Sequence, residues 1–293
     1  MKKLYYIFAI LSGLLFGSGG IFVRTLTQNG IDSTTLLFLR FSIALPVILM
    51  VILVSDRNLL KIRLKDLKLF IVTGLSIIAL NLCYNTSVNC VSLSLAAILL
   101  SSAPVFVIIF AYVLFKERIT SKKIVSIALV IMGCILTTGL LEGNVANVSA
   151  MGILAGAGSA IFWAIYTVAS KKCLEEGIET YTILFYSLII ITIVLLPVTS
   201  FTQISTFINL NVGPNIVFLI LHSLFCFAMP YVLLTLSLNH IDSGSASILT
   251  SGAEPLSALV YGIIVYSEIP TPLMFFGMIL AIIALAILSK SES

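Results

Sequence analysis

Two stretches of the sequence share one pattern: residues 103–117 read APVFVIIFAYVLFKE and residues 254–268 read EPLSALVYGIIVYSE. In both copies a proline stands at the second position and a glutamate closes the stretch thirteen residues later. A threonine suited to begin the next helix follows each glutamate. The same pair of helices is therefore encoded twice, once in each half of the chain.

The composition around these stretches is that of a membrane protein. Hydrophobic residues make up 60% of the 293 residues and charged residues only 10%, whereas about a quarter of the residues in soluble domains are charged. The charges form short clusters between long apolar runs, which is typical of membrane spans. The net charge of +4 forms no basic stripe with interleaved aromatic residues, so we expect no nucleic-acid partner.

Cutting the chain at its charge clusters and at Gly, Pro and Asn turns predicts an all-α integral membrane protein with ten transmembrane helices. We expect helices because the hydrocarbon core offers no water to the backbone amides and carbonyls. The expected helices cover residues 4–24, 33–54, 67–87, 93–115, 122–140, 150–171, 180–199, 214–238, 243–266 and 270–289. Small residues three or four apart, such as Gly13, Gly17 and Gly20, predict close helix packing.

The basic residues predict how the chain is oriented in the cytoplasmic membrane. All 16 Lys and Arg residues except Arg24 and Arg40 fall at the chain ends or on alternate loops that face one side. Basic loops stay in the cytoplasm, so both termini are expected to be cytoplasmic. The loops at 141–149 and 200–213, which hold no Lys or Arg, are expected to face outward.

The repeat predicts two five-helix halves, residues 1–140 and 150–293, joined by an extracellular linker at 141–149. Because five is an odd number, the second half enters the membrane from the opposite face, which makes the repeat an inverted one. Inverted repeats are typical of secondary transporters, which bind substrate near the midplane and alternate access by moving one repeat against the other.

The doubled arrangement resembles the EamA family of the drug/metabolite transporter superfamily. The resemblance rests on the mid-helix prolines, the glutamates thirteen residues beyond them, Trp163 and the Glu254-Pro255 pair, and it extends over residues 9–139 and 151–288. It implies a ten-helix transporter with a central cavity that moves small metabolites such as amino acids, often by export. The family name does not fix the substrate.

Two charged residues, Arg40 and Glu254, fall well inside predicted spans. A charge in the hydrocarbon core costs about 3 kcal/mol even on lenient scales, and it normally marks a pathway or a partnered site. Glu254 lies about 16 Å into its helix, where we expect it to bind a cationic or zwitterionic substrate or to take up a coupling proton. The alternative is a structural role beside Pro255, which frees a backbone carbonyl. Arg40 is expected to reach the membrane surface or to pair with Asp32, and the alternative is that it recognises substrate.

Other polar and aromatic side chains complete a candidate substrate site. The amides of Asn81 and Asn85 offer donors and acceptors without the cost of a charge, and the aromatic residues could form its walls. The alternatives to a substrate-binding role are helix packing for the two amides, anchoring at the membrane interface for Trp163 and a structural position in the core for His222. The candidate substrate-binding residues are Asn81, Tyr84, Asn85, Trp163, Tyr166, His222, Tyr231, Thr250 and Glu254.

Missing motifs narrow the function classes. The five cysteines show no C-x-x-C spacing, and the chain has no Walker motif, no H-E-x-x-H and no credible nucleophile and base, so we expect neither an enzyme nor a cofactor. The leading prediction is a secondary transporter of a small amino-acid-like or amphipathic metabolite, working as a monomer or homodimer. Rivals are choline-like quaternary ammonium uptake through an aromatic cage and lipid translocation.

Overall fold

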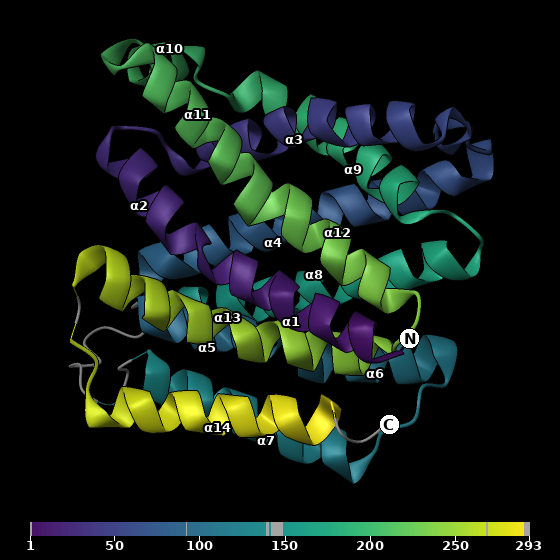
Figure 1. Cartoon of the computed structure of the whole chain (residues 1–293), viewed down its shortest axis with the longest axis vertical. Helices are drawn as coiled ribbons and strands as arrows, with labels where there is room; N and C mark the ends of the chain where they lie inside the picture. Colours follow the sequence, from purple (N-terminus) through teal and green to yellow (C-terminus); the bar gives the residue numbers. More distant parts are fainter. Residues whose placement is uncertain (1, 92, 139–140, 142–148, 268, 290–293) are drawn as a thin grey trace.

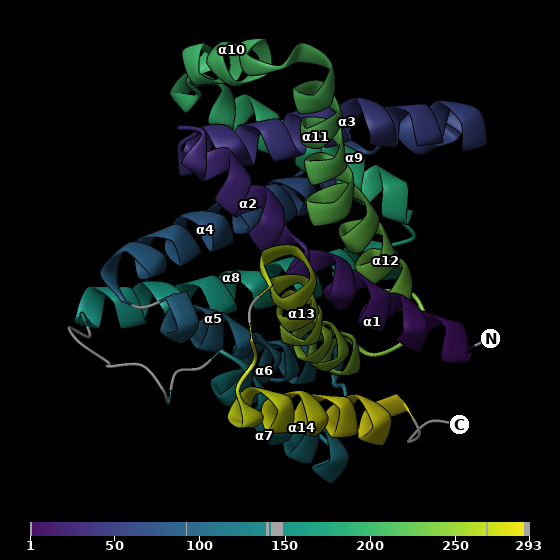
Figure 2. The same ribbon diagram turned by 60° about the vertical axis from the view of Figure 1, so that its left-hand side comes forward.

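The computed structural model describes residues 2–91, 93–138, 141, 149–267 and 269–289, and all regular structure in these ranges is helical (Figure 1). The predicted all-α class is confirmed. The helices run side by side across the width of the molecule, and both chain ends lie on the same side of it in two views (Figures 1 and 2). Glu268, Lys290 and residues 142–148 of the expected linker lie outside the described residues.

The described residues form seven α-helices in each half of the chain. The first half contains α1 (Lys2–Gly17), α2 (Gly19–Gln28), α3 (Ser33–Ser55), α4 (Leu67–Cys90), α5 (Leu93–Ser101), α6 (Ala103–Phe115) and α7 (Ser121–Thr137). The second half contains α8 (Ala150–Glu175), α9 (Thr180–Leu195), α10 (Phe201–Leu210), α11 (Val212–Ser223), α12 (Met229–Leu238), α13 (Ser243–Tyr266) and α14 (Pro272–Ser289). Short 3-10 turns occupy Arg57–Leu60, Leu64–Asp66 and Leu196–Val198, and Leu224–Ala228 forms a π-helical turn.

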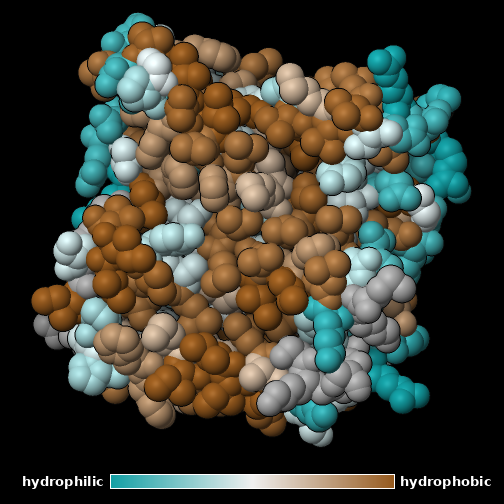
Figure 3. Space-filling view, viewed as in Figure 1, coloured by the Kyte–Doolittle hydropathy of each residue, from teal (hydrophilic) through white to brown (hydrophobic). Residues whose placement is uncertain are grey.

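Eight helical segments of the described chain are long and apolar enough to cross a membrane. The protein is therefore a multi-pass membrane protein. Of the other expected spans, α7 has 17 residues and Pro272–Leu288 of α14 is a shorter apolar helix, so the count of ten remains a prediction. The surface agrees with membrane insertion, because apolar side chains cover its centre and hydrophilic ones gather at the two edges where the helices end (Figure 3).

Three of the expected continuous helices are interrupted. The first breaks at Ser18, between α1 and α2, and the fourth breaks at Ser102, between α5 and α6. At each break the serine hydroxyl donates to a carbonyl three residues back, at 2.6 Å. Two of the interruptions have a proline nearby, since Pro104 follows Ser102 and Pro230 follows the π-helical turn; proline lacks an amide hydrogen and crowds the preceding turn. Pro255, the twin of Pro104, instead lies within a continuous α13.

The expected loop at 200–213 contains a ten-residue helix, α10, which is too short to be predicted as a membrane span. Its N-terminus is capped by Ser200, whose hydroxyl accepts from the amide of Gln203. Phe207 is buried in a small apolar cluster with residues of α2, α3 and α11. Gln203 accepts a hydrogen bond from the amide of Asp32 at 2.9 Å. The segment is therefore an amphipathic helix that lies over the start of α3 (Figure 1).

Close contact between α1 and α13 fixes the helix that carries Glu254. The two helices pack along each other, as do α4 with α8 and α7 with α14. A Cβ atom on Gly13 would overlap the carbonyl of Thr250, and one on Gly17 would overlap Ser257 Oγ and the carbonyl of Glu254. The predicted packing role is correct for these two glycines. It is wrong for Gly20, because a Cβ there would meet nothing within 4 Å.

Candidate functional site

Glu254 lies half-buried in the middle of α13, beside three other helices. Its carboxyl group interacts electrostatically with the side chains of Tyr84 on α4, Cys134 on α7 and Tyr231 on α12. It makes no hydrogen bond or ion pair with any residue that the structure describes. A partly buried acid without a protein partner can bind a cationic group or a proton.

An aromatic cluster lies next to this acid. Tyr231 is surrounded by Tyr166, Phe16 and Trp163, with ring centroids 5.1, 5.1 and 6.1 Å away. The indole Nε1 of Trp163 is buried and has no hydrogen-bond partner among the described residues. Three of the candidate residues from two different helices, α8 and α12, thus meet in one place. A ligand acceptor beside Trp163 could use the free indole donor.

The hydroxyls of the two buried tyrosines differ in their surroundings. Tyr166 is fully buried, and its hydroxyl lies 3.4 Å from Thr235 Oγ1. The Tyr231 hydroxyl has no partner in the described part of the chain. Of this pair, Tyr231 is therefore the one with a hydroxyl to offer a ligand.

The three candidate residues on α4 also differ in whether their polar groups have a partner. Asn81 donates its amide to the carbonyl of Ile77 on the preceding turn, at 2.8 Å, so that donor is occupied within the helix. Tyr84 and Asn85 are half-buried, and their polar groups bond to none of the described side chains or carbonyls. Of the two, Tyr84 also lies within electrostatic range of Glu254.

The polar groups of Thr250 and His222, two further candidates, bond to other parts of the protein. Thr250 is buried, and its hydroxyl donates to the carbonyl of Ala9 at 3.2 Å, which ties α13 to α1. His222 is fully buried near the end of α11, where its Nε2 accepts a hydrogen bond from Arg40 Nε at 3.2 Å. Thr250 lies four residues before Glu254 on the same helix, but its hydroxyl proton is used in the contact with α1.

The expected Arg40–Asp32 pair is wrong. Asp32 instead caps α3, because its Oδ1 accepts from the amides of Thr34 and Thr35 and its Oδ2 accepts from the Thr35 hydroxyl. Burial would raise the pKa of Asp32, but the bonds from Thr35 and Thr34 outweigh it and lower that pKa below its ordinary value. Arg40 lies too far along α3 to share this carboxylate, about 12 Å by helical rise.

A second polar cluster holds the start of α13, on the side of the molecule where the chain ends lie; we call it the α13 N-terminal cluster. Glu117 accepts from the amide and hydroxyl of Ser243, both at 3.0 Å, and Lys123 lies 2.6 Å from the carboxylate of Asp242. Asp242 also caps the helix by accepting from the amide of Ser245. The sequence marked Glu117 only as part of the repeat and gave no signal for this partner, which is 126 residues away.

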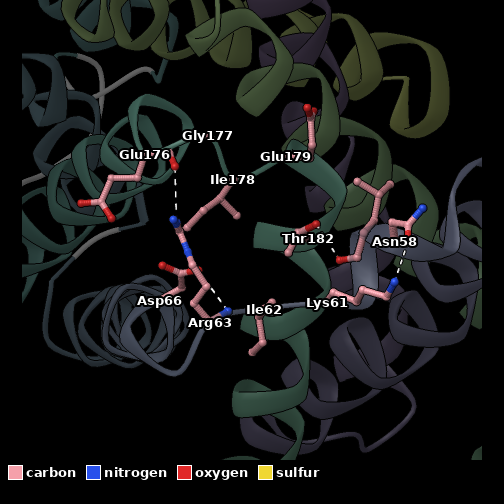
Figure 4. Close-up of a pocket in the computed structure, with 11 residues that line it drawn as sticks. Asn58, Lys61, Ile62, Arg63, Asp66, Glu176, Gly177, Ile178, Glu179 and Thr182 are labelled. Atoms are coloured by element: carbon pink, nitrogen blue, oxygen red, sulfur yellow. Dashed lines mark hydrogen bonds and ion pairs between the residues drawn. The ribbon is translucent and has the colours of Figure 1, made fainter.

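A pocket of about 280 Å³ lies where the α3–α4 connection meets the turn between α8 and α9 (Figure 4). Arg63 donates to Asp66 Oδ2 at 2.9 Å and to the carbonyl of Glu176 at 3.4 Å, and Thr182 donates to the carbonyl of Leu59. These groups bond to one another across the connection. The polar groups that line this pocket hold the two connections together. We therefore take the groups around Glu254, and not this pocket, as the candidate substrate site.

Comparison with known proteins agrees with this architecture. The model of the EamA-like transporter family matches twice, over residues 3–139 and 150–290. An uncharacterized transporter of Clostridium kluyveri is 29% identical over 92% of this chain and 87% of its own length, and one of Archaeoglobus fulgidus is 29% identical over 94% of each chain. A solved crystal structure covers both chains completely with a TM-score of 0.79 at 14% identity, so the two share a fold.

Proposed function

The chain belongs to the EamA-like transporter family and is a membrane transporter, and on this premise we propose that it is a secondary transporter of a small metabolite. The solute is amino-acid-like or otherwise polar or amphipathic, and it is exported across the cytoplasmic membrane by alternating access. A transmembrane gradient supplies the energy, with a proton as the candidate coupling ion.

The single observation that carries this proposal is the setting of Glu254. An ionisable group inside a membrane span is costly and is kept where it binds substrate or moves ions. Here the carboxyl group has no partner among the described residues, and the Tyr84 and Tyr231 side chains beside it are also free to bind. The acid is therefore available to a solute or to a proton.

The proposed architecture has ten spans in two inverted halves, 1–140 and 150–293, with both termini in the cytoplasm. The family model supports two repeats, since it matches once in each half. Both termini lie on one side of the molecule (Figure 2), which an even number of spans requires. The break at Ser102 and the π-helical turn at Leu224–Ala228 are places where helices can bend during alternating access.

Replacing Glu254 tests the function directly. We expect Glu254→Gln, which keeps size and hydrogen bonding, to insert normally and to reduce transport in proteoliposomes by at least about tenfold, the loss of one charged contact. The solutes tested for transport are radiolabelled amino acids, nucleobases and choline, which together form the solute panel. Glu175→Gln, at an exposed acid in the last turn of α8, is the matched control. Wild-type rates and an unchanged pH profile in Glu254→Gln would show that the carboxyl group is structural.

A second candidate function is uptake of a quaternary ammonium compound. The cluster of Trp163, Tyr166 and Tyr231 beside Glu254 favours it, because aromatic faces and an acid attract such cations. Against it, the Tyr166 and Tyr231 rings contact each other edge to face at 5.1 Å, so a cation would have to displace them. Choline transport in the same panel decides between the two candidates.

A further inference from the structure

We propose that Arg40, positioned by His222, is an anion-binding subsite that takes the carboxylate of the transported solute. The inference rests on the proposed transport function and adds a second charged residue to the site. The comparisons assign no role to either residue.

The first argument is the unbalanced charge of Arg40. It lies seven residues into α3, which spans Ser33–Ser55, and it is half-buried. Its guanidinium group is always protonated, yet no carboxylate among the described residues pairs with it. The nearest acid along the helix, Asp32, is already bonded to Thr34 and Thr35. A permanent charge inside a membrane span without a counter-charge leaves room for an anion from outside the protein.

The second argument is the excess of hydrogen-bond donors. Arg40 Nε donates to His222 Nε2 at 3.2 Å, so this nitrogen carries no proton. The proton of the neutral imidazole then sits on Nδ1, which is buried and has no partner within the described ranges. The pair therefore has free donors on both residues, the Nη groups and Nδ1–H, while its imidazole acceptor is occupied. An oxyanion supplies the acceptors that the pair lacks.

The third argument is the direction in which Arg40 is held. His222 is fully buried on α11, so its bond to Nε draws the guanidinium group toward the helix bundle. Ser223 also donates to the carbonyl of Arg40 at 2.7 Å and fixes α3 against the same segment. This geometry favours a solute inside the bundle over a lipid phosphate at the membrane surface.

The fourth argument is continuity with the aromatic cluster. Arg40 interacts electrostatically with Tyr231, and so does Glu254. The ring of Phe41, the next residue on α3, contacts Phe227, which in turn lies 4.3 Å from the Tyr231 ring. Tyr231 is thus within electrostatic range of both a cation from α3 and an acid from α13. A solute beside Tyr231 would place its carboxylate toward Arg40.

The test compares acids with their amides on purified protein in nanodiscs. We measure thermal stabilisation by the standard L-amino acids and by their carboxamides, in which the carboxylate is neutralised. We expect wild-type protein to prefer at least one acid over its amide. Arg40→Gln should lower affinity for that acid by about tenfold or more, as expected for a lost charge-assisted bond, and leave affinity for the amide unchanged. Arg57→Gln, at an exposed arginine outside the spans, should behave as wild type.

Two further variants keep the test decisive if Arg40→Gln does not fold. Arg40→Lys retains the charge but loses the fork-shaped donor group, and it should weaken binding of the acid only. His222→Gln retains an acceptor for Arg40 Nε, and it should raise the KM for the acid with little change in the maximal rate.

Several results would overturn the subsite. They are the absence of any acid preference in wild type, an equal loss for acid and amide in Arg40→Gln, and no binding of any carboxylate in the panel. Stabilisation by phosphatidylglycerol over phosphatidylcholine that disappears in Arg40→Gln while acid binding persists would assign Arg40 to a lipid. Transport of an uncharged or cationic solute that Glu254→Gln abolishes and Arg40→Gln does not would uphold the transporter and overturn this subsite alone.

Discussion

At the scale of single residues, the two halves of the repeat share a proline within the helix, but only the second half has an acid beside it. Pro104 and Pro255 occupy equivalent places, yet Ala103 stands where the second half has Glu254. If the acid only compensated for its proline, Pro104 would need similar help. The first half has no acid at this position, and Ser102 donates to the carbonyl of Leu99, not to that of Leu100, which lies four residues before Pro104 and loses its amide partner to the proline. The asymmetry supports a role for Glu254 in binding.

Substituting two tyrosines near the acid tests which tyrosine hydroxyl contributes to binding and which only packs in the core. We expect Tyr84→Phe to lower transport several-fold, because its hydroxyl is free and interacts with Glu254. Tyr166→Phe is the matched control and should stay within about twofold of wild type, since its fully buried hydroxyl lies 3.4 Å from Thr235 Oγ1 within the protein and such a bond adds about 1 kcal/mol. Initial transport rates at equal expression measure both. Equal losses in the two variants would contradict the assignment.

At the scale of helices, the contact between α1 and α13 determines where Glu254 lies. Gly17 lets the two backbones approach, because a side chain there would meet Ser257 and the carbonyl of Glu254. The helix that carries the acid therefore depends on a residue about 240 positions earlier in the chain.

Glycine substitutions test this packing. We expect Gly17→Ala to lower the free energy of unfolding by about 1–3 kcal/mol, since an extra methyl group must displace packed backbone. Gly20→Ala should be neutral or slightly stabilising, because nothing lies within 4 Å of its Cβ position. Thermal unfolding in detergent measures both. A larger loss in Gly20→Ala than in Gly17→Ala would show that the α1–α13 contact is not tight.

The α13 N-terminal cluster gives a prediction about pH. Burial would raise the pKa of Asp242, but the Lys123 ammonium group outweighs it and lowers that pKa below its ordinary value of 3.8. A lowered pKa in the folded state means that the pair stabilises the protein above pH 3.8 and loses that effect as the pH falls through the folded-state pKa. We expect Lys123→Met to destabilise by about 1–3 kcal/mol near neutral pH and to move acid destabilisation to higher pH.

Melting temperature against pH checks this prediction for both proteins. Lys122→Met, one residue away at an exposed position, is the control and should follow the wild-type curve. A Lys123→Met curve parallel to wild type at all pH values would show that the ion pair does not stabilise the folded state.

At the scale of the whole molecule, the distribution of charge agrees with the positions of the chain ends. Both termini lie on the same side (Figure 1). The α13 N-terminal cluster, with Glu117 and Lys123, lies on this side too. The opposite side carries α10, whose sequence FTQISTFINL holds no Lys or Arg. This arrangement is the one that the positive-inside rule predicts for cytoplasmic termini.

Accessibility labelling tests the orientation in intact cells. A membrane-impermeant maleimide should label Gly213→Cys, at the start of α11, and should label Asn58→Cys only after the cells are opened. Both positions are exposed, and wild type gives the background from its free cysteines. Labelling of Asn58→Cys but not Gly213→Cys in intact cells would reverse the proposed topology.

The class of protein, the location of nearly every helix and the two charges inside spans could be predicted from the amino-acid sequence alone. In lipid a chain must satisfy its backbone within each segment, so long apolar runs are sufficient to predict helices. The sequence analysis also assigned Trp163, Tyr166 and Tyr231 to one site, because an inverted-repeat transporter binds substrate between its repeats. The amphipathic α10 was missed because it is too short and too polar to be read as a span.

Which polar side chains remain without a protein partner depends on how the helices pack, and this could not be predicted from the sequence. Arg40 bonds to His222 and not to Asp32, Thr250 bonds to Ala9, and Glu117 binds the start of α13. These partners lie between 126 and 241 residues apart. The sequence could not rank them because lipid-facing and protein-facing sides of a membrane helix are both apolar, so hydrophobic periodicity does not show which face meets another helix. The available groups around Glu254 follow from that packing.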